Sequence, residues 1–146
     1  MPSEVRLFVR TALILFALSM ALGAGLVGWR HLGGRPVGWP WVVVHTHLAL
    51  VGGMLLMVMG VAFWMFPLDR VKFPETKGRY RPGLVHAVYG CVTGGLALRS
   101  VVEPIQGDAS GGPLGLLLVL AAALQAVGMG LFLVAIWPRV RSVTAP

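Results

Sequence analysis

The chain has 146 residues, of which 57% are hydrophobic and only 12% are charged, and its formal net charge is +7. Because a soluble domain carries about a quarter charged residues, this composition excludes a soluble globular protein and predicts an integral membrane protein. The positive charge does not indicate a nucleic-acid partner, since the basic residues stand beside the apolar runs, where they orient a protein in the lipid bilayer.

Four apolar runs are each close to the roughly 20 residues that a helix needs to cross the bilayer core. Backbone groups in lipid find no water to bond with, so these spans are expected to be helices. Short connectors make neighbouring helices antiparallel. The sequence therefore predicts an all-α, up-down, antiparallel four-helix bundle that forms a single membrane domain over residues 1–146. The predicted spans are residues 7–28, 41–66, 83–102 and 114–137.

The first predicted span has Arg6 and Arg10 at its start, before the apolar run of residues 11–28. A signal peptide begins in a similar way, but we expect this segment to remain as the first helix. The connector after it is rich in Gly and Pro, which is typical of a loop outside the membrane, and it contains His31.

The second predicted span begins with two histidines, His45 and His47. Helix residues advance by about 100° each, so the two imidazoles should point to nearly opposite faces and should not both bind one iron atom. The face below His45 continues through the small residues Ala49 and Gly52, which would leave a notch for a flat macrocycle. We therefore expect His45 to be the axial ligand of a haem. His47 would donate a hydrogen bond beside it, bind another metal or face a neighbouring subunit.

A motif of the form H-x-H-x4-G-x7-G-x6-P runs through His45, His47, Gly52, Gly60 and Pro67. It resembles the haem-bearing second helix of subunit I in the haem–copper oxidase and nitric oxide reductase superfamily. Its spacing is closest to that of the NnrS family, haem- and copper-containing membrane proteins of the nitric-oxide response. The resemblance covers one of the four predicted helices, and it implies that His45 and His47 ligate haem b at the outer end of this helix.

The sequence also departs from that superfamily, whose catalytic centre takes further histidines from helices that this sequence does not contain. No complete oxygen- or nitric-oxide-reducing centre is therefore expected within the chain. The resemblance favours a haem b protein of respiratory or nitric-oxide metabolism that transfers electrons, binds a gas, or serves as an accessory subunit. Its expected partners are other copies of itself or a larger respiratory or nitric oxide reductase complex.

Other interpretations stay open at this point. The bound metal could be copper, or there could be no cofactor, in which case the histidines of an accessory or assembly subunit contact only carbonyls, headgroups or a partner. A small transporter is a third interpretation. It is opposed by the absence of an acidic residue deep in any predicted span, since proton-coupled carriers generally need one.

The third predicted span carries Arg99 near its outer end, where an uncompensated charge is costly and usually marks function. We expect Arg99 to bind a haem propionate, or else to reach the membrane surface or pair with Glu103, four residues further on. His86 lies one turn into this span, at the opposite membrane surface from His45 and roughly 25–30 Å away. The two cannot share one haem within a monomer, so His86 is a candidate for a separate inner metal site. A second axial ligand would come from His31 or from another copy.

The basic residues that flank the apolar runs are divided unequally between the two sides. Nine lie at the N-terminus, in the connector after the second span and in the tail, against two in the connector before the second span. The positive-inside rule then places both termini in the cytoplasm, with the chain in a bacterial-type inner membrane. Trp29, Trp39 and Trp41 are expected in the outer interfacial belt, and Trp64 and Trp137 in the inner one.

Overall fold

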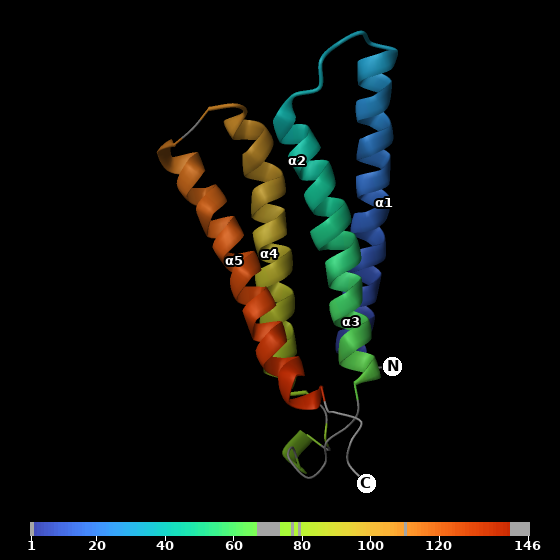
Figure 1. Ribbon diagram of the computed structural model, residues 1–146, viewed down its shortest axis with the longest axis vertical. Helices are drawn as coiled ribbons and strands as arrows, with labels where there is room; N and C mark the ends of the chain where they lie inside the picture. Colours follow the sequence, from blue (N-terminus) through green and yellow to red (C-terminus); the bar gives the residue numbers. More distant parts are fainter. Residues whose placement is uncertain (1, 67–73, 77, 79, 110, 141–146) are drawn as a thin grey trace.

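A computed structural model of the protein describes residues 2–66, 74–76, 78, 80–109 and 111–140. Over these residues the protein is all-α, and four of its helical rods are long and apolar enough to cross a membrane. They alternate in direction along the chain, as Figure 1 shows. The predicted fold class, a four-helix multi-pass membrane protein, is confirmed.

Each observed helix boundary lies within four residues of the predicted one. Most helices run somewhat beyond the apolar run that defines the span, because backbone hydrogen bonding continues into the polar residues at the membrane surface. The second span is one continuous rod made of α2, the π-helix η1 and α3. In chain order the elements are α1 (Ser3–His31), α2 (Trp39–His47), η1 (Leu48–Leu55), α3 (Leu56–Met65), η2 (Pro74–Thr76), α4 (Pro82–Gln106), α5 (Gly112–Ile136) and η3 (Trp137–Arg139).

Three of the α-helices have a proline as their first or second residue: Pro40 in α2, Pro82 in α4 and Pro113 in α5. The amide that proline lacks would have no intrahelical partner at this position, and its fixed φ angle suits a helix. The prolines therefore define where the helices start without weakening them.

The four rods form two hairpins that fan apart. α1 packs along η1 and α3, and α4 packs along α5. We call the end of the bundle that carries the starts of α1 and α4 the terminal end, and the end that carries residues 32–38 the distal end. Towards the distal end α1 and α5 diverge to either side, while α2 and α4 stay between them, as Figure 1 shows.

The close-packed core lies in the terminal half, where all four rods meet. Phe63 of α3 stands at its centre, with its ring centroid 5.7 Å from that of Phe8, 4.7 Å from Tyr80 and 5.3 Å from Phe132. All three pairs meet edge to face, which is the favourable arrangement for aromatic quadrupoles. The aromatic rings thus join α1, α3, α5 and Tyr80, which lies two residues before the start of α4.

A buried arginine adds a polar connection at the terminal end. Arg139 is 3% exposed, and its guanidinium donates a 2.7 Å hydrogen bond to the carbonyl oxygen of Gly78. Its Cζ also lies 3.9 Å from the centroid of the Tyr80 ring. Arg139 therefore ties the connector before α4 to the end of α5.

Glycines allow the helices to approach closely. A Cβ built on Gly60 of α3 would lie 2.7 Å from Phe8 Cβ, and one built on Gly95 of α4 would lie 2.6 Å from the carbonyl oxygen of Ala121 in α5. Small residues at such contacts are the usual means of packing helices in lipid, where van der Waals contact and not water exclusion holds helices together. Any larger residue at either position would push the helices apart.

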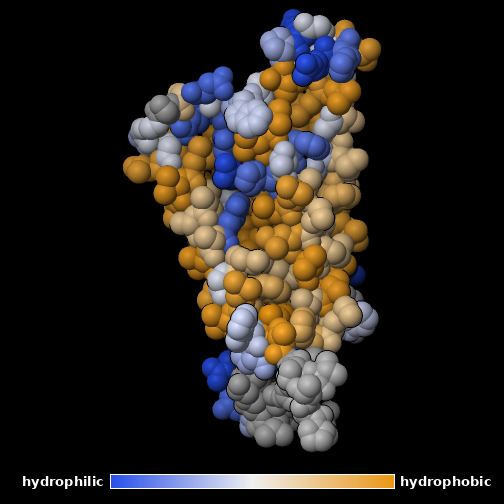
Figure 2. Space-filling model, viewed as in Figure 1, coloured by the Kyte–Doolittle hydropathy of each residue, from blue (hydrophilic) through white to orange (hydrophobic). Residues whose placement is uncertain are grey.

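The surface has the distribution of a membrane protein. Figure 2 shows hydrophobic residues over most of the visible face of the bundle and hydrophilic ones at both of its ends. All five tryptophans are exposed, by 46% to 77%, and they stand at the two ends as the predicted belts require. Which end faces the cytoplasm stays a prediction, because several of the basic residues behind it lie outside the described residues: Arg70, Lys72, Lys77, Arg79 and Arg141.

Candidate functional site

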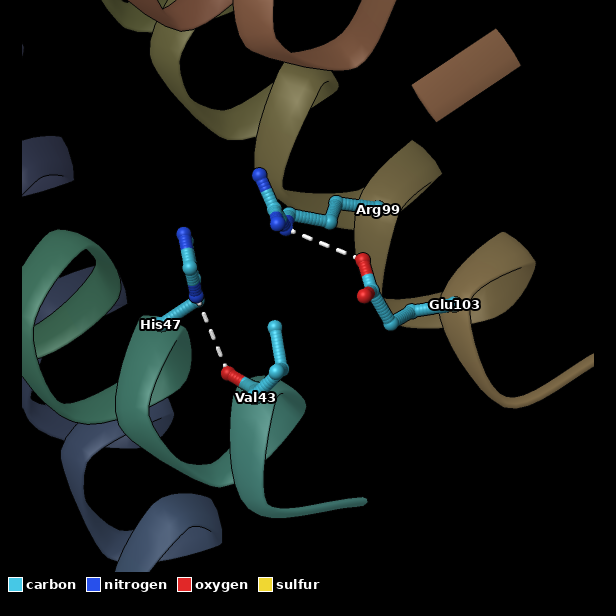
Figure 3. Close-up of polar contacts among 4 residues, drawn as sticks. All are labelled: Val43, His47, Arg99 and Glu103. Carbon is cyan, nitrogen blue, oxygen red and sulfur yellow. Dashed lines mark hydrogen bonds and ion pairs between the residues drawn. The ribbon is translucent and has the colours of Figure 1, made fainter. Parts of the chain in front are cut away.

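The two histidines at the end of α2 face different neighbours. His45 lies against α1, and His47 projects towards the side on which α4 runs (Figure 3). This agrees with the prediction that the two imidazoles point to different faces of the helix. The two residues therefore have different surroundings and different chemical possibilities.

His45 is held by Ser19 of α1. Its Nδ1 donates to the Ser19 carbonyl oxygen at 2.9 Å and lies 3.1 Å from the Ser19 hydroxyl, which itself donates to the His45 carbonyl oxygen at 2.9 Å. The ring lies over Gly23, where a Cβ would be only 2.6 Å from His45 Cε1 and 3.3 Å from Nε2. His45 thus serves as a polar contact between α1 and α2, with its ring edge directed at the α1 backbone.

The notch that we expected below His45 is filled by protein. Gly52 is buried, and a Cβ built on it would lie 2.9 Å from Leu96 Cδ2 and 3.0 Å from Leu15 Cβ. The small residue makes room for leucines of α4 and α1 and leaves no room for a macrocycle. A haem does not fit on the surface that we expected to run from His45 through Ala49 and Gly52.

The rod also changes its helical type directly after His47. η1 is an eight-residue π-helix, Leu48–Leu55, between the α-helical segments α2 and α3. A wider turn alters the angle between successive side chains, so faces counted at 100° per residue no longer hold below His47. Segments of π-helix inside α-helices are rare and occur frequently at functional sites.

His47 has an arrangement that suits a metal ligand. Its Nδ1 lies 3.0 Å from the carbonyl oxygen of Val43, one turn earlier in α2, and must donate to it. The proton is thereby fixed on Nδ1 and the lone pair on Nε2, which is how a second bond orients histidines that bind metals. Nε2 has no hydrogen-bond partner among the described residues.

Arg99 of α4 faces the same space as His47 (Figure 3). Its Nε lies 3.2 Å from Oε2 of Glu103, and the two side chains are 23% and 15% exposed. The predicted pairing of these two residues is therefore observed. The contact has the distance of an ion pair but lacks the alignment of a hydrogen bond, so neither group is fully satisfied by the other.

Further polar groups lie on the same part of α4. Ser100 Oγ and Gln106 Oε1 are buried, and neither has a hydrogen-bond partner among the described residues. Buried polar atoms normally have a hydrogen-bond partner, because a buried polar atom without a hydrogen bond costs about 1–3 kcal/mol. Figure 2 shows hydrophilic residues that run down the distal half of the bundle, over α4 and α2, on a largely hydrophobic face. Among the described residues, this stretch of α4 thus gathers several buried side-chain atoms without a hydrogen bond, and Tyr80 and Gln125 have one such atom each elsewhere.

The remaining histidines are separate from this site. His86 lies in the first turns of α4, is exposed, and donates from Nδ1 to the Pro82 carbonyl oxygen at 2.8 Å. It belongs to the terminal end, whereas His45 and His47 belong to the distal half, so the predicted separation holds. His31 is exposed at the last position of α1. Over residues 2–66, 74–76, 78, 80–109 and 111–140, no three His, Cys, Asp or Glu side chains gather as a metal site.

Sequence reasoning missed two contributors to this region. Nothing in the stretch around Ser19 distinguishes it from any other small polar residue in a membrane span, so its bonds to His45 could not be expected. The π-helix had at most a weak signal, the Gly52–Gly53 pair, since two adjacent glycines lower the cost of irregular helix geometry.

Comparison with known proteins adds no family to this description: no protein-family model, no curated protein and no solved structure matches the chain. The functional argument therefore depends on the residues and their geometry.

Proposed function

We propose that the protein is a haem b-binding integral membrane protein in which His47, and not His45, is the axial ligand. The observation that carries this proposal is the state of the His47 ring, whose Nδ1 is bonded to the Val43 carbonyl oxygen while Nε2 has no partner among the described residues. The imidazole of His45 is instead engaged by Ser19 and covered by Gly23. Nε2 of His45 also has no hydrogen-bond partner among the described residues, so packing and not donor chemistry favours His47: the His45 ring lies against Gly23 of α1, whereas His47 faces α4.

Arg99 supports the same assignment. A haem carries two propionates, and a guanidinium that shares a space with the ligand histidine is the natural partner for one of them. Arg99 is held by an ion pair whose alignment is poor, so a propionate could take over its remaining donors while Glu103 keeps its place on α4. Ser100 and Gln106 offer further polar atoms nearby on the helix.

The bound haem would supply a redox-active iron that exchanges an electron or binds a diatomic gas. His47 provides one axial ligand from within the chain, because His86 belongs to the other end of the bundle. His47 would hold the group together with Arg99, and a residue of another copy would be needed to hold it from a second side. The haem would supply electron transfer or the binding of nitric oxide or oxygen, which is the chemistry of respiratory or nitric-oxide metabolism. In this proposal the chain lies in a bacterial-type inner membrane, and both of its termini are on the cytoplasmic side.

A second candidate function, that of an accessory subunit, is favoured by one face of α4. Gly90 and Gly94 are exposed, and a Cβ built on either would meet no atom within 4 Å. Two glycines four residues apart on an exposed membrane helix form a surface that another helix can approach closely. The partner would be a second copy of the chain or a subunit of a larger reductase complex.

The experiment that tests the haem proposal is an absorbance spectrum of the protein purified from haem-replete cells. We expect a Soret band in the wild type that is lost in His47→Ala and that shifts when nitric oxide is added. Arg99→Gln should retain the band but bind haem about tenfold more weakly, because it loses one charge-assisted hydrogen bond. A colourless wild-type preparation would contradict the haem proposal and leave the accessory function.

A further inference from the structure

A cavity of about 650 Å³ lies on the hairpin of α1 and α2, on a different part of the molecule from Arg99. Ala21 and Gly25 of α1 form a part of its wall with little side chain, and Trp29 and Trp41 stand at its side. Its lining is almost entirely apolar. A cavity of this size is in the range that encloses a small-molecule ligand, roughly 300–1,000 Å³.

The position of the cavity matches the level of a membrane interface. Both tryptophans belong to the group at the distal end, where amphipathic rings lie among lipid headgroups. Below them, towards Ala21, α1 continues into the apolar part of the span. A ligand in this cavity would therefore have its polar end at the tryptophans and its apolar end along α1.

Positive charge stands at the polar end of the cavity. The Arg35 guanidinium carbon lies 5.2 Å from the centroid of the Trp29 ring, which itself lines the cavity. Arg30 and His31 are exposed at the end of the same helix. The sequence from residue 5 to residue 66 contains no Asp or Glu, so this hairpin supplies no carboxylate to neutralise Arg30 or Arg35.

We propose that this cavity binds an anionic phospholipid, with an acyl chain against Ala21 and Gly25 and the phosphate at Arg35. The apolar wall suits the chain, and the cation beside Trp29 is complementary to the phosphate. The site is independent of the proposed haem, because it uses neither His47 nor Arg99. A lipid here fills the space between α1 and the segment that leads into α2.

Gly25 allows a direct test by filling the cavity. A Cβ built on Gly25 would meet no protein atom within 4 Å, so a leucine there can enter the cavity without colliding with a neighbouring helix. Gly83 of α4 is a matched control, since it too is an exposed helical glycine whose Cβ would meet nothing within 4 Å, and it does not line the cavity.

The experiment is native mass spectrometry of the protein released from bilayers of equal parts phosphatidylglycerol and phosphatidylcholine. Wild-type protein and Gly83→Leu should retain one more phosphatidylglycerol per chain than Gly25→Leu. Arg35→Gln should still retain a lipid, but its preference for phosphatidylglycerol over phosphatidylcholine should fall about fivefold.

Three results would overturn the proposal. Gly25→Leu could retain as much phosphatidylglycerol as the wild type, or Arg35→Gln could keep the full preference for the anionic lipid. Alternatively, a Soret band could disappear in Gly25→Leu and persist in His47→Ala, which would make the cavity the haem site. A colourless protein that still retains the lipid would contradict only the haem proposal, so the two can fail separately.

Discussion

The side chains of the terminal and distal halves of this bundle are packed differently. In the terminal half all four rods meet around Phe63, whose neighbours are aromatic rings, and Arg139 is bonded to Gly78. In the distal half α1 and α5 diverge, and polar groups of Ser100 and Gln106 are buried without partners among the described residues. The terminal half is closely packed, with the Tyr80 hydroxyl as a buried group without a hydrogen bond, whereas the distal half has several buried polar atoms that lack one among the described residues.

The difference indicates that the two halves of the bundle have different roles. Packing that is complete contributes stability, whereas unsatisfied groups in a membrane cost free energy unless something binds them. We therefore assign most of the stability to the terminal half and ligand binding to the distal half. The predictions below test this division, starting with the variant of largest expected effect.

Phe63→Ala should destabilise the protein most. It removes a ring that touches Phe8, Tyr80 and Phe132 and leaves a cavity where all four rods meet, so the free energy of unfolding should fall by about 3 kcal/mol or more. Leu116→Ala is the control, because Leu116 is 72% exposed on the distal part of α5 and should change stability by less than about 0.5 kcal/mol. Helix content followed by circular dichroism during SDS titration measures both. Equal losses would contradict the division between the halves.

Gly95→Ala and Gly94→Ala should act in opposite directions although they are adjacent in α4. A methyl group on Gly95 would lie 2.6 Å from a backbone oxygen of α5, so the helices must move and stability should fall by about 1–3 kcal/mol. A methyl group on Gly94 meets nothing within 4 Å and should stabilise the helix by up to about 1 kcal/mol. The same unfolding titration distinguishes them, and a loss in both variants would show that Gly94 is also packed.

Ser19→Ala should have a smaller effect, confined to stability. It removes the hydroxyl that bonds to His45, at a cost of about 1 kcal/mol, while the Ser19 carbonyl oxygen remains as the acceptor for Nδ1. A double-mutant cycle with His45→Ala should give a coupling free energy of at least about 0.5 kcal/mol. Coupling near zero would mean that His45 is not held by this serine.

Tyr80→Phe should change stability only at high pH. Burial raises the pKa of Tyr80 above its usual 10.0, and the charge of Arg139 opposes this in part. Because the folded-state pKa is the higher one, the folded protein keeps the phenol proton longer, and the associated stability is present below pH 10 and lost as the pH rises beyond it. At pH 7 the variant should match the wild type, since the hydroxyl has no hydrogen-bond partner among the described residues. If both proteins lose the same stability between pH 9 and pH 11, roughly one unit either side of the usual value, the assignment to Tyr80 is wrong.

The sequence was sufficient to predict the four spans and the opposite directions of His45 and His47. The bilayer imposes the length and apolar character of each span, and the histidines stand in regular α-helix, where the angle per residue is constant. The surroundings of His45 were not predictable in the same way. A small residue such as Gly52 indicates that something approaches closely, but not whether it is a cofactor or a leucine from another helix. The partner is decided by tertiary packing, and by η1, which alters the faces below His47.

The measurement that tests the central claim most directly is the ratio of haem to protein in His45→Ala and His47→Ala, purified in parallel and assayed as the pyridine complex. Both substitutions remove the same side chain from α2, two residues apart, so they are matched controls for each other. The account predicts that His45→Ala retains the haem content of the wild type and that His47→Ala loses it. Haem that is lost in His45→Ala and retained in His47→Ala would contradict it.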